Sequence, residues 1–151
     1  MAASKGGKRR RRPVDKTGRG GGQWIELPYG MIHHDSFRAL SGPAVKVWLE
    51  LRSRYNGGNN GRLTLSYREA ADLLGMGKTT AQRAFAELES AGFIELATEG
   101  DWYGRKAHEW RATDIPHDGK HATRDWQHPK AALSGESEKQ NTVLRRDSSK
   151  G

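Results

Sequence analysis

The 151-residue sequence contains no cysteine, which excludes disulfide bonds, zinc sites built from thiolates and cysteine nucleophiles. It also lacks any apolar run close to the roughly 20 residues that a membrane-spanning helix requires. The basic N-terminus is followed by a Gly-rich stretch at 18–23, where the apolar core of a signal peptide would lie. We therefore expect neither membrane insertion nor secretion, and the absence of cysteine fits a reducing cytoplasm.

Large hydrophobic residues are scarce as well. Only 34% of the chain is hydrophobic, too little to fill a core along its whole length. The scarcity is greatest over 1–23, rich in Lys, Arg and Gly, and over 135–151, rich in Ser, Glu, Lys and Gln. Neither segment buries enough apolar surface to offset the entropy lost on ordering. The sequence predicts a disordered basic arm (1–23), one domain (24–116), a loosely ordered extension (117–134) and a disordered tail (135–151).

The net charge of +8 is concentrated in the arm. Residues 1–23 carry eight Lys or Arg and one Asp, a net charge of +7, whereas residues 24–116 carry −1 and residues 117–151 carry +2. The alkaline pI therefore describes the arm and says little about the domain. A case for nucleic-acid binding by the domain has to come from the patterning of its residues.

Hydrophobic spacing predicts a first helix after an extended lead-in at 24–28 and a single helical turn around 35–40. Ser41 is a good N-cap, and Pro43 lies in the first turn, where its missing N–H costs nothing. The helix stops at the Asn/Gly-rich segment 56–61. The positions expected to face the core are Ala44, Val45, Trp48, Leu49, Leu51 and Tyr55.

A tight turn joins the next two helices. Ser66 and Glu69 form a capping-box pattern, in which the serine accepts a bond from the Glu69 amide and the Glu69 carboxylate reaches back. The second helix ends at the three-residue turn 75–77, and the third runs from 78 to 91 until Gly92 stops it. Their expected core positions are Tyr67, Ala70, Ala71 and Leu74 in the second and Ala81, Ala84, Phe85 and Leu88 in the third.

Strand patterns flank this helix pair. Residues 62–65 alternate as a short strand, and residues 93–98 and 106–113 predict the two strands of a β-hairpin with a turn at 99–104. From 114 to 126 the pattern is weak, and it predicts a loop or partial strand that closes over the domain. The predicted fold class is mainly α with a small β-hairpin (α+β).

The order helix, short strand, helix, three-residue turn, helix, β-hairpin resembles the winged helix-turn-helix domains of bacterial transcription regulators and of plasmid and phage replication initiators. Residues 65–88 carry the resemblance most clearly, and 89–94 look like the family's usual exit into the wing. The positions that match the packing between the family's two helices are Ala71, Leu74, Gly75, Ala81 and Leu88. The resemblance implies a three-helix core plus a wing, and double-stranded DNA as the partner.

A helical wheel separates two faces of the third helix. The core positions point inward, while polar residues point outward or flank that face near the N-terminal end. In a recognition helix this end enters the major groove, where Arg pairs with guanine and Gln with adenine. The residues expected to read bases are Thr79, Thr80, Gln82 and Arg83. Glu87 and Glu89 lie toward the far end, away from DNA phosphates.

Hydroxyl and basic groups at the helix starts and in the wing turn are the expected phosphate contacts, which fix register without reading sequence. They are Ser66, Arg68, Lys78, Arg105 and Lys106. Arg68 and Lys78 are equally compatible with free surface charges. Trp102 and Tyr103, in the same turn, either pack on the hairpin or meet DNA.

The sequence contains no complete motif of a catalytic, nucleotide-binding or metal site. The segment 75–79 resembles a phosphate-binding loop, but the required earlier glycine is replaced by Asp72 and the preceding strand is missing. The histidines, at His33, His34, His117, His121 and His128 outside the wing, lack the spacing of a metal site. There is no serine elbow and no paired carboxylate set in a plausible cleft. The sequence predicts a non-enzymatic protein without metal or cofactor.

We therefore expect sequence-specific binding of double-stranded DNA by a cytoplasmic, nucleoid-associated transcriptional regulator, either as a monomer or as a homodimer. Two alternatives remain open. One is a plasmid or phage replication or partition protein that uses the same domain to mark an origin. The other is an RNA-binding protein that uses the Arg/Gly arm, with the domain as a protein-interaction module.

Overall fold

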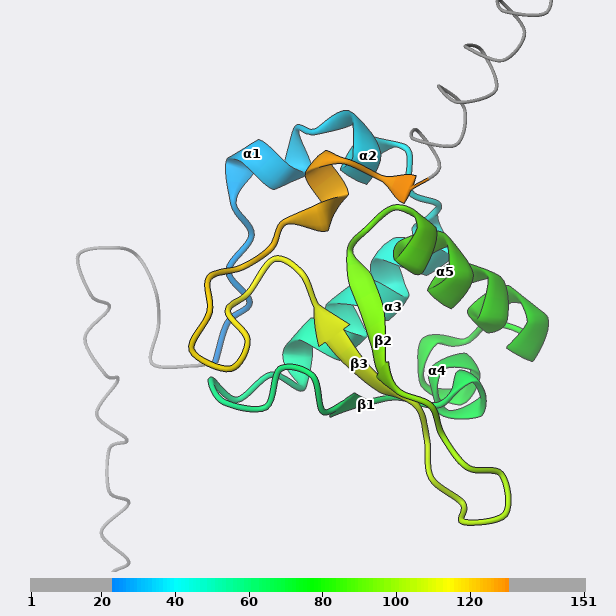
Figure 1. Cartoon of the computed structure of the whole chain (residues 1–151). Coiled ribbons are helices and arrows are strands. Elements are labelled where there is room, and N and C mark those ends of the chain that lie inside the picture. Colours follow the sequence, from blue (N-terminus) through cyan, green and yellow to red (C-terminus); the bar gives the residue numbers. More distant parts are fainter. Residues whose placement is uncertain (1–22, 131–151) are drawn as a thin grey trace, which may run out of the picture.

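A computed structural model describes residues 23–130 (Figure 1). Except for Gln23, the expected arm at 1–23 lies outside that range, as does the tail at 135–151. The elements are α1 (Tyr29–Ile32), α2 (Asp35–Arg38), α3 (Gly42–Ser53), β1 (Leu63–Thr64), α4 (Tyr67–Leu74), α5 (Lys78–Ser90), β2 (Ile94–Thr98), β3 (Glu109–Ala112) and the 3-10 helix η1 (Asp125–Gln127). Helices α3, α4 and α5 pack beside a three-stranded sheet, confirming the predicted α+β winged helix-turn-helix fold.

Helix α3 begins at the predicted cap, where Ser41 Oγ accepts a hydrogen bond from the Ala44 amide at 3.3 Å. Its buried stripe differs from the prediction, because Val47 and Arg52 are buried and Val45 is only half-buried. Leu49 and Tyr55, also expected in the core, are partly buried at its edge. The physical reason is that α3 packs along one line of residues spaced i, i+3, i+4, i+7 from Ala44, which includes position 47 and leaves 45 to the side.

The turn between α4 and α5 has the predicted three residues. Gly75 ends α4 with a left-handed backbone (φ +65°), which glycine adopts without strain. At the start of α4, Ser66 Oγ accepts from the Glu69 amide at 3.1 Å, which confirms one half of the capping box. The Glu69 carboxylate does something else: it accepts a charge-assisted bond from Arg54 Nη2 at 2.9 Å. The second half of the predicted capping box is therefore replaced by an ion pair to the end of α3.

The inward face of α5 is the predicted one, since Ala81, Ala84, Phe85 and Leu88 are all buried. Gly92 (φ +82°) ends the helix in a Schellman motif. The Gly92 amide donates a hydrogen bond to Glu89 O, and the Phe93 amide donates one to Leu88 O. A Cβ atom at position 92 would lie 2.5 Å from the carbonyl oxygen of Asp125. Both the backbone conformation and this close approach require glycine here, at the point where the chain leaves α5 for the wing.

The sheet is antiparallel in the order β1-β3-β2, with Trp110 of β3 opposite both Leu63 and Leu96. The second wing strand is shorter than the predicted 106–113, because β3 begins at Glu109 and residues 99–108 form a loop. At the base of this loop the Gly100 amide donates to His108 Nδ1 at 2.9 Å. A side-chain acceptor thus takes the place of a backbone acceptor, and the strand ladder ends there.

The chain after β3 returns to the core through one aromatic residue. Trp126, in η1, is 5% exposed and stacks on Phe93, with ring centroids 6.2 Å apart. Its carbonyl oxygen accepts from Ser36 Oγ at 2.7 Å, which ties η1 to α2. Within the expected extension at 117–134, Trp126 is therefore anchored in the domain, while most residues from 118 to 125 are exposed. The sequence pattern there is weak because a single large ring supplies most of the anchoring.

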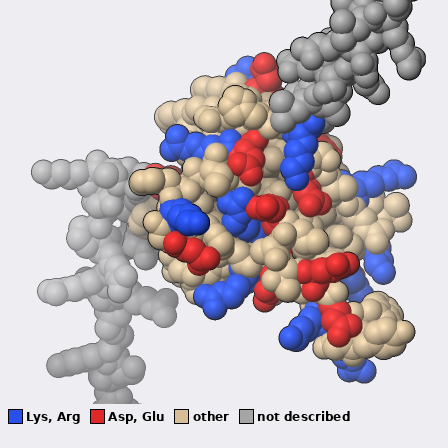
Figure 2. All heavy atoms as spheres, viewed as in Figure 1, with Lys and Arg blue, Asp and Glu red and all other residues tan. Residues whose placement is uncertain are grey.

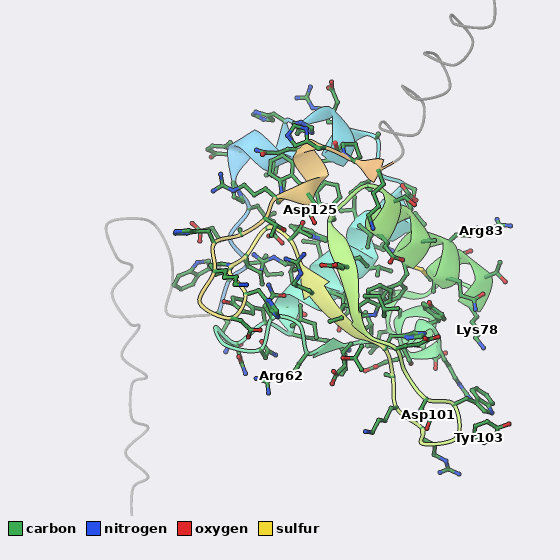
Figure 3. All side chains as sticks on the ribbon, viewed as in Figure 1. Arg62, Lys78, Arg83, Asp101, Tyr103 and Asp125 are labelled. Atoms are coloured by element: carbon green, nitrogen blue, oxygen red, sulfur yellow. The ribbon has the colours of Figure 1, made fainter. Side chains whose placement is uncertain are left out.

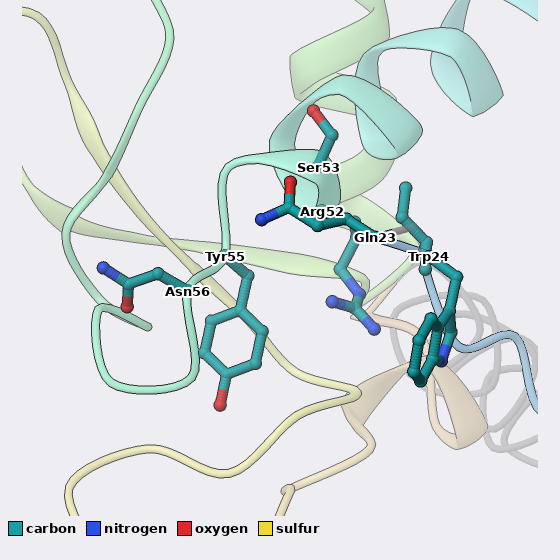
Figure 4. Close-up of a pocket in the computed structure, with 7 residues that line it drawn as sticks. Gln23, Trp24, Arg52, Ser53, Tyr55 and Asn56 are labelled. Atoms are coloured by element: carbon teal, nitrogen blue, oxygen red, sulfur yellow. The ribbon is translucent and has the colours of Figure 1, made fainter. Parts of the chain in front are cut away.

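A buried ion pair holds the start of this returning segment to α3. Arg52 Nε donates to Asp114 Oδ2 at 2.8 Å, and both side chains are almost fully buried. Burial raises the pKa of Asp114 above its ordinary value, although the neighbouring Arg52 opposes the shift. Arg52 also lines a cavity of about 730 Å³ beside Trp24 and Tyr55 (Figure 4). Because Arg52 Nη2 also donates to Glu26 O at 3.3 Å, the pair links α3, the lead-in and the residues that follow β3.

Replacing Trp126 with alanine should lower the free energy of unfolding by about 3–5 kcal/mol, since a buried aromatic ring and its stack on Phe93 are removed. Trp102→Ala is the matched control, because that ring is exposed, and it should stay within about 0.5 kcal/mol of the parent. Urea unfolding of both variants measures the difference. Equal midpoints and slopes for Trp126→Ala and the parent would contradict the assignment of Trp126 to the core.

Candidate nucleic-acid interface

The outward face of α5 is polar near its N-terminal end. Lys78, Thr79, Gln82 and Arg83 are exposed and Thr80 is half-buried. Figure 3 shows Lys78 and Arg83 pointing away from the body of the domain on the same side. The four residues expected to read bases and one expected phosphate contact thus lie along one helix, outside its buried face.

The acidic residues toward the other end of α5, Glu87 and Glu89, are half-buried. The two carboxylate oxygens of Glu87 each accept a 2.6 Å hydrogen bond from Ser41, one from its amide and one from its hydroxyl. This places the negative charge at the positive end of the α3 dipole. Burial raises the pKa of the Tyr67 hydroxyl, and the charge of the half-buried Glu89 raises it further. Neither carboxylate offsets the positive charge at the start of α5.

Four rings fix the wing relative to α5. The Phe85 ring stacks on Trp110 of β3 and meets Tyr67 of α4 edge-on, with centroids 5.1 Å apart in both pairs. His108 lies 5.5 Å from Tyr67 and 5.9 Å from Trp110. Because His108 also accepts the Gly100 amide, the base of the wing loop is joined to the aromatic cluster between α4 and α5.

Three of the expected phosphate contacts are brought together in space. Ser66, Arg105 and Lys106 line a pocket of about 540 Å³ between the start of α4 and the wing loop. Arg68 is exposed on the first turn of α4, and Lys78 is exposed at the start of α5. Asp101 also lines this hollow, so its two cations and helix-capping hydroxyl stand beside one carboxylate, and the balance of charge still favours an anionic oxygen.

The wing tip contains two aromatic residues, Trp102 and Tyr103. From the sequence, they either pack on the hairpin or meet DNA. The structure shows that Trp102 and Tyr103 project into solvent, with exposures of 86% and 95%. Figure 3 places Tyr103 at the tip, on the side of the molecule that also carries Lys78. Packing on the hairpin, one of the two roles considered from the sequence, does not occur. The flanking glycines signal a tight turn, but they do not show which way the rings point.

The described part of the chain offers no alternative metal centre. Between residues 23 and 130 no three His, Asp or Glu side chains come close enough to share a metal ion. The longest helix in that range, α5, has 13 residues, and no described helix combines the length and apolar character needed to cross a bilayer.

Comparison with known families agrees with this architecture. A family described as a helix-turn-helix domain matches residues 38–94, which extend from the end of α2 to the start of β2. No curated protein and no solved structure shows significant similarity to the chain. Helix-turn-helix domains place their second helix in the major groove of DNA, and α5 has the position of that helix within the matched residues.

Replacing His108 with alanine should loosen the wing, since the Gly100 amide loses its acceptor and the Tyr67 ring loses a neighbour. Loss of a hydrogen bond of roughly 0.5–1.5 kcal/mol predicts about two- to tenfold faster amide exchange at Gly100. Hydrogen exchange followed by NMR measures it, with the exposed His121→Ala as control. Unchanged protection of Gly100 would show that the wing is held by other contacts.

Proposed function

We propose that the helix-turn-helix domain at residues 38–94, together with its wing, binds double-stranded DNA in a sequence-specific manner and acts in transcription regulation. The observation that carries the proposal is the outward face of α5. It presents hydroxyl, amide and guanidinium groups at Thr79, Gln82 and Arg83, while Glu87, toward the other end of the same helix, is half-buried and bonded to Ser41.

In this proposal α5 lies in the major groove. Its 13 residues span roughly 20 Å at 1.5 Å per residue, and the groove is about 12 Å wide and admits a helix. Arg83, one turn in from the start of α5, donates to a base edge, with guanine as its preferred partner. Lys78, at the helix start, neutralises a phosphate at the groove edge.

The rest of the interface supplies affinity and register. Phosphates contact the hollow lined by Ser66, Arg105 and Lys106, and Arg68 lies on the same helix as Ser66. The described domain is nearly neutral, so most of the non-specific electrostatic attraction comes from the eight Lys and Arg of residues 1–23. Base readout and charge are therefore carried by different parts of the chain.

Selection of bound duplexes from a random DNA pool tests the proposal and its finer features. A palindromic motif supports a homodimer that acts at an operator in the cytoplasm, on the nucleoid. A motif repeated in tandem favours the replication or partition role on a plasmid or phage. Preference for single-stranded RNA over every duplex would contradict the proposal and favour RNA binding through the arm.

Replacing Arg83 with alanine should relax the preference at one base position, because a bidentate pair with guanine contributes about 1–3 kcal/mol of discrimination. Binding to random DNA should change little, and the thermal midpoint should be unchanged because the side chain is exposed. A competition series that varies each base of the selected site in turn measures the effect.

Arg62→Ala is the matched control for that series, since Arg62 is also exposed and Figure 3 shows it on a different side of the molecule from Arg83. It should leave every base preference unchanged. If Arg83→Ala weakens all duplexes equally, the side chain contacts phosphate, and α5 is not oriented in the groove as proposed.

Deleting residues 1–23 should weaken specific and random duplexes by a similar factor, since charges on a chain of this composition have little capacity for oriented hydrogen bonds. For every phosphate that the shortened chain no longer neutralises, the salt dependence should flatten by about 0.9 log units of affinity per log unit of salt. Titrations at several salt concentrations measure both effects. Loss of discrimination with intact random-DNA affinity would mean instead that the arm reads sequence.

A further inference from the structure

The wing tip exposes more aromatic surface than the other large hydrophobic residues of the described part of the chain. Trp102 and Tyr103 are 86% and 95% exposed, whereas the next, Tyr29, is 80% exposed on α1. In the fold, Tyr29 and the wing tip lie at opposite ends of the domain (Figure 1). Two adjacent rings left in water at the end of a projecting loop need a reason beyond folding, because they contribute nothing to the core.

The loop that carries the rings is braced. Asp101 Oδ1 accepts the Tyr103 amide at 2.9 Å, and Asp101 O accepts the Lys106 amide at 3.0 Å. A Cβ atom at Gly100 would lie 2.4 Å from Lys106 O, and one at Gly104 would lie 2.8 Å from the Asp101 carboxylate. The loop is therefore a tight turn that is held by hydrogen bonds between its own residues. These bonds fix the backbone that carries the two rings.

The chemistry around the rings is that of a nucleic-acid contact. Arg105 and Lys106 follow them after Gly104 and Asp101 precedes them, and Figure 2 shows both basic and acidic side chains beside the tan surface of the projecting wing. The tip also lies on the side of the molecule that carries Lys78 at the start of α5 (Figure 3). Flanking cations attract phosphates, while the flat, apolar faces of the rings match the faces of bases.

We propose that Trp102 and Tyr103 form a wedge that enters the minor groove next to the site of α5 and unstacks one base step by stacking on the exposed base. This inference rests on the proposed function and adds to it a deformation of the DNA. Apolar side chains inserted between base steps kink the duplex and cost stacking energy, which is lowest at flexible pyrimidine–purine steps. The wedge therefore makes the wing sensitive to DNA deformability, while its cations contact phosphates.

The test uses the full chain and the selected duplex, with 2-aminopurine placed in turn at each position flanking the site, because its fluorescence rises when it is unstacked. The parent protein should raise the fluorescence at one step, at the base that loses its stacked neighbour and is not covered by either ring, because a base stacked on Trp or Tyr stays quenched. The double variant Trp102→Ala, Tyr103→Ala should abolish the rise and weaken binding by about tenfold or more, the effect expected when base stacking is removed. Its salt dependence should stay that of the parent, since both replaced side chains are uncharged.

Two controls separate stacking from hydrophobicity and charge. Trp102→Phe with Tyr103→Phe retains aromatic faces and should retain the fluorescence rise, and Tyr29→Ala removes an exposed ring elsewhere and should change nothing. Arg105→Ala with Lys106→Ala should flatten the salt dependence instead. Tight duplex binding with silent 2-aminopurine at every position, or with unchanged affinity of the double alanine variant, overturns the wedge alone. Absence of any duplex binding by the parent overturns the proposed function as well.

Discussion

The stacking of Phe85 is the interaction on which the rest of the structure depends. Its ring is buried between Tyr67 of α4 and Trp110 of β3, so one side chain of α5 touches the preceding helix and the central strand of the sheet. Because the protein interior is close-packed, these three elements move little relative to one another. The outward face of α5 and the wing loop are consequently held as one surface.

Different residues fix the two ends of α5. Their positions determine where the charged side chains of this helix lie. Gly75 turns the chain between the helices, and Gly92 ends α5 while the backbone of η1 passes against it. Glu87 then binds the N-terminus of α3 through Ser41. In a domain with almost no net charge, the start of α5 is thus cationic, and Glu87 near its other end is bonded to the start of α3.

The residue patterns predicted the helix-turn-helix accurately where the controlling interactions are local. The four buried positions of α5, the three-residue turn and the cap at Ser41 follow from period, glycine and N-cap chemistry within a few residues. Errors arose where a competing partner came from elsewhere. Val47 displaced Val45 because of how α3 packs, and Glu69 paired with Arg54 rather than completing its own capping box.

The sequence by itself determined the three helices of the core, most of their buried positions, and that the positive charge is concentrated in residues 1–23, since these depend on spacing and composition. Only the tertiary structure decided that Trp126 stacks on Phe93, that Arg52 pairs with Asp114, and that Trp102 and Tyr103 project from the wing. The first two contacts join residues 33 and 62 positions apart. Such pairings, like the direction of a loop, depend on how whole elements pack, and no local pattern encodes them.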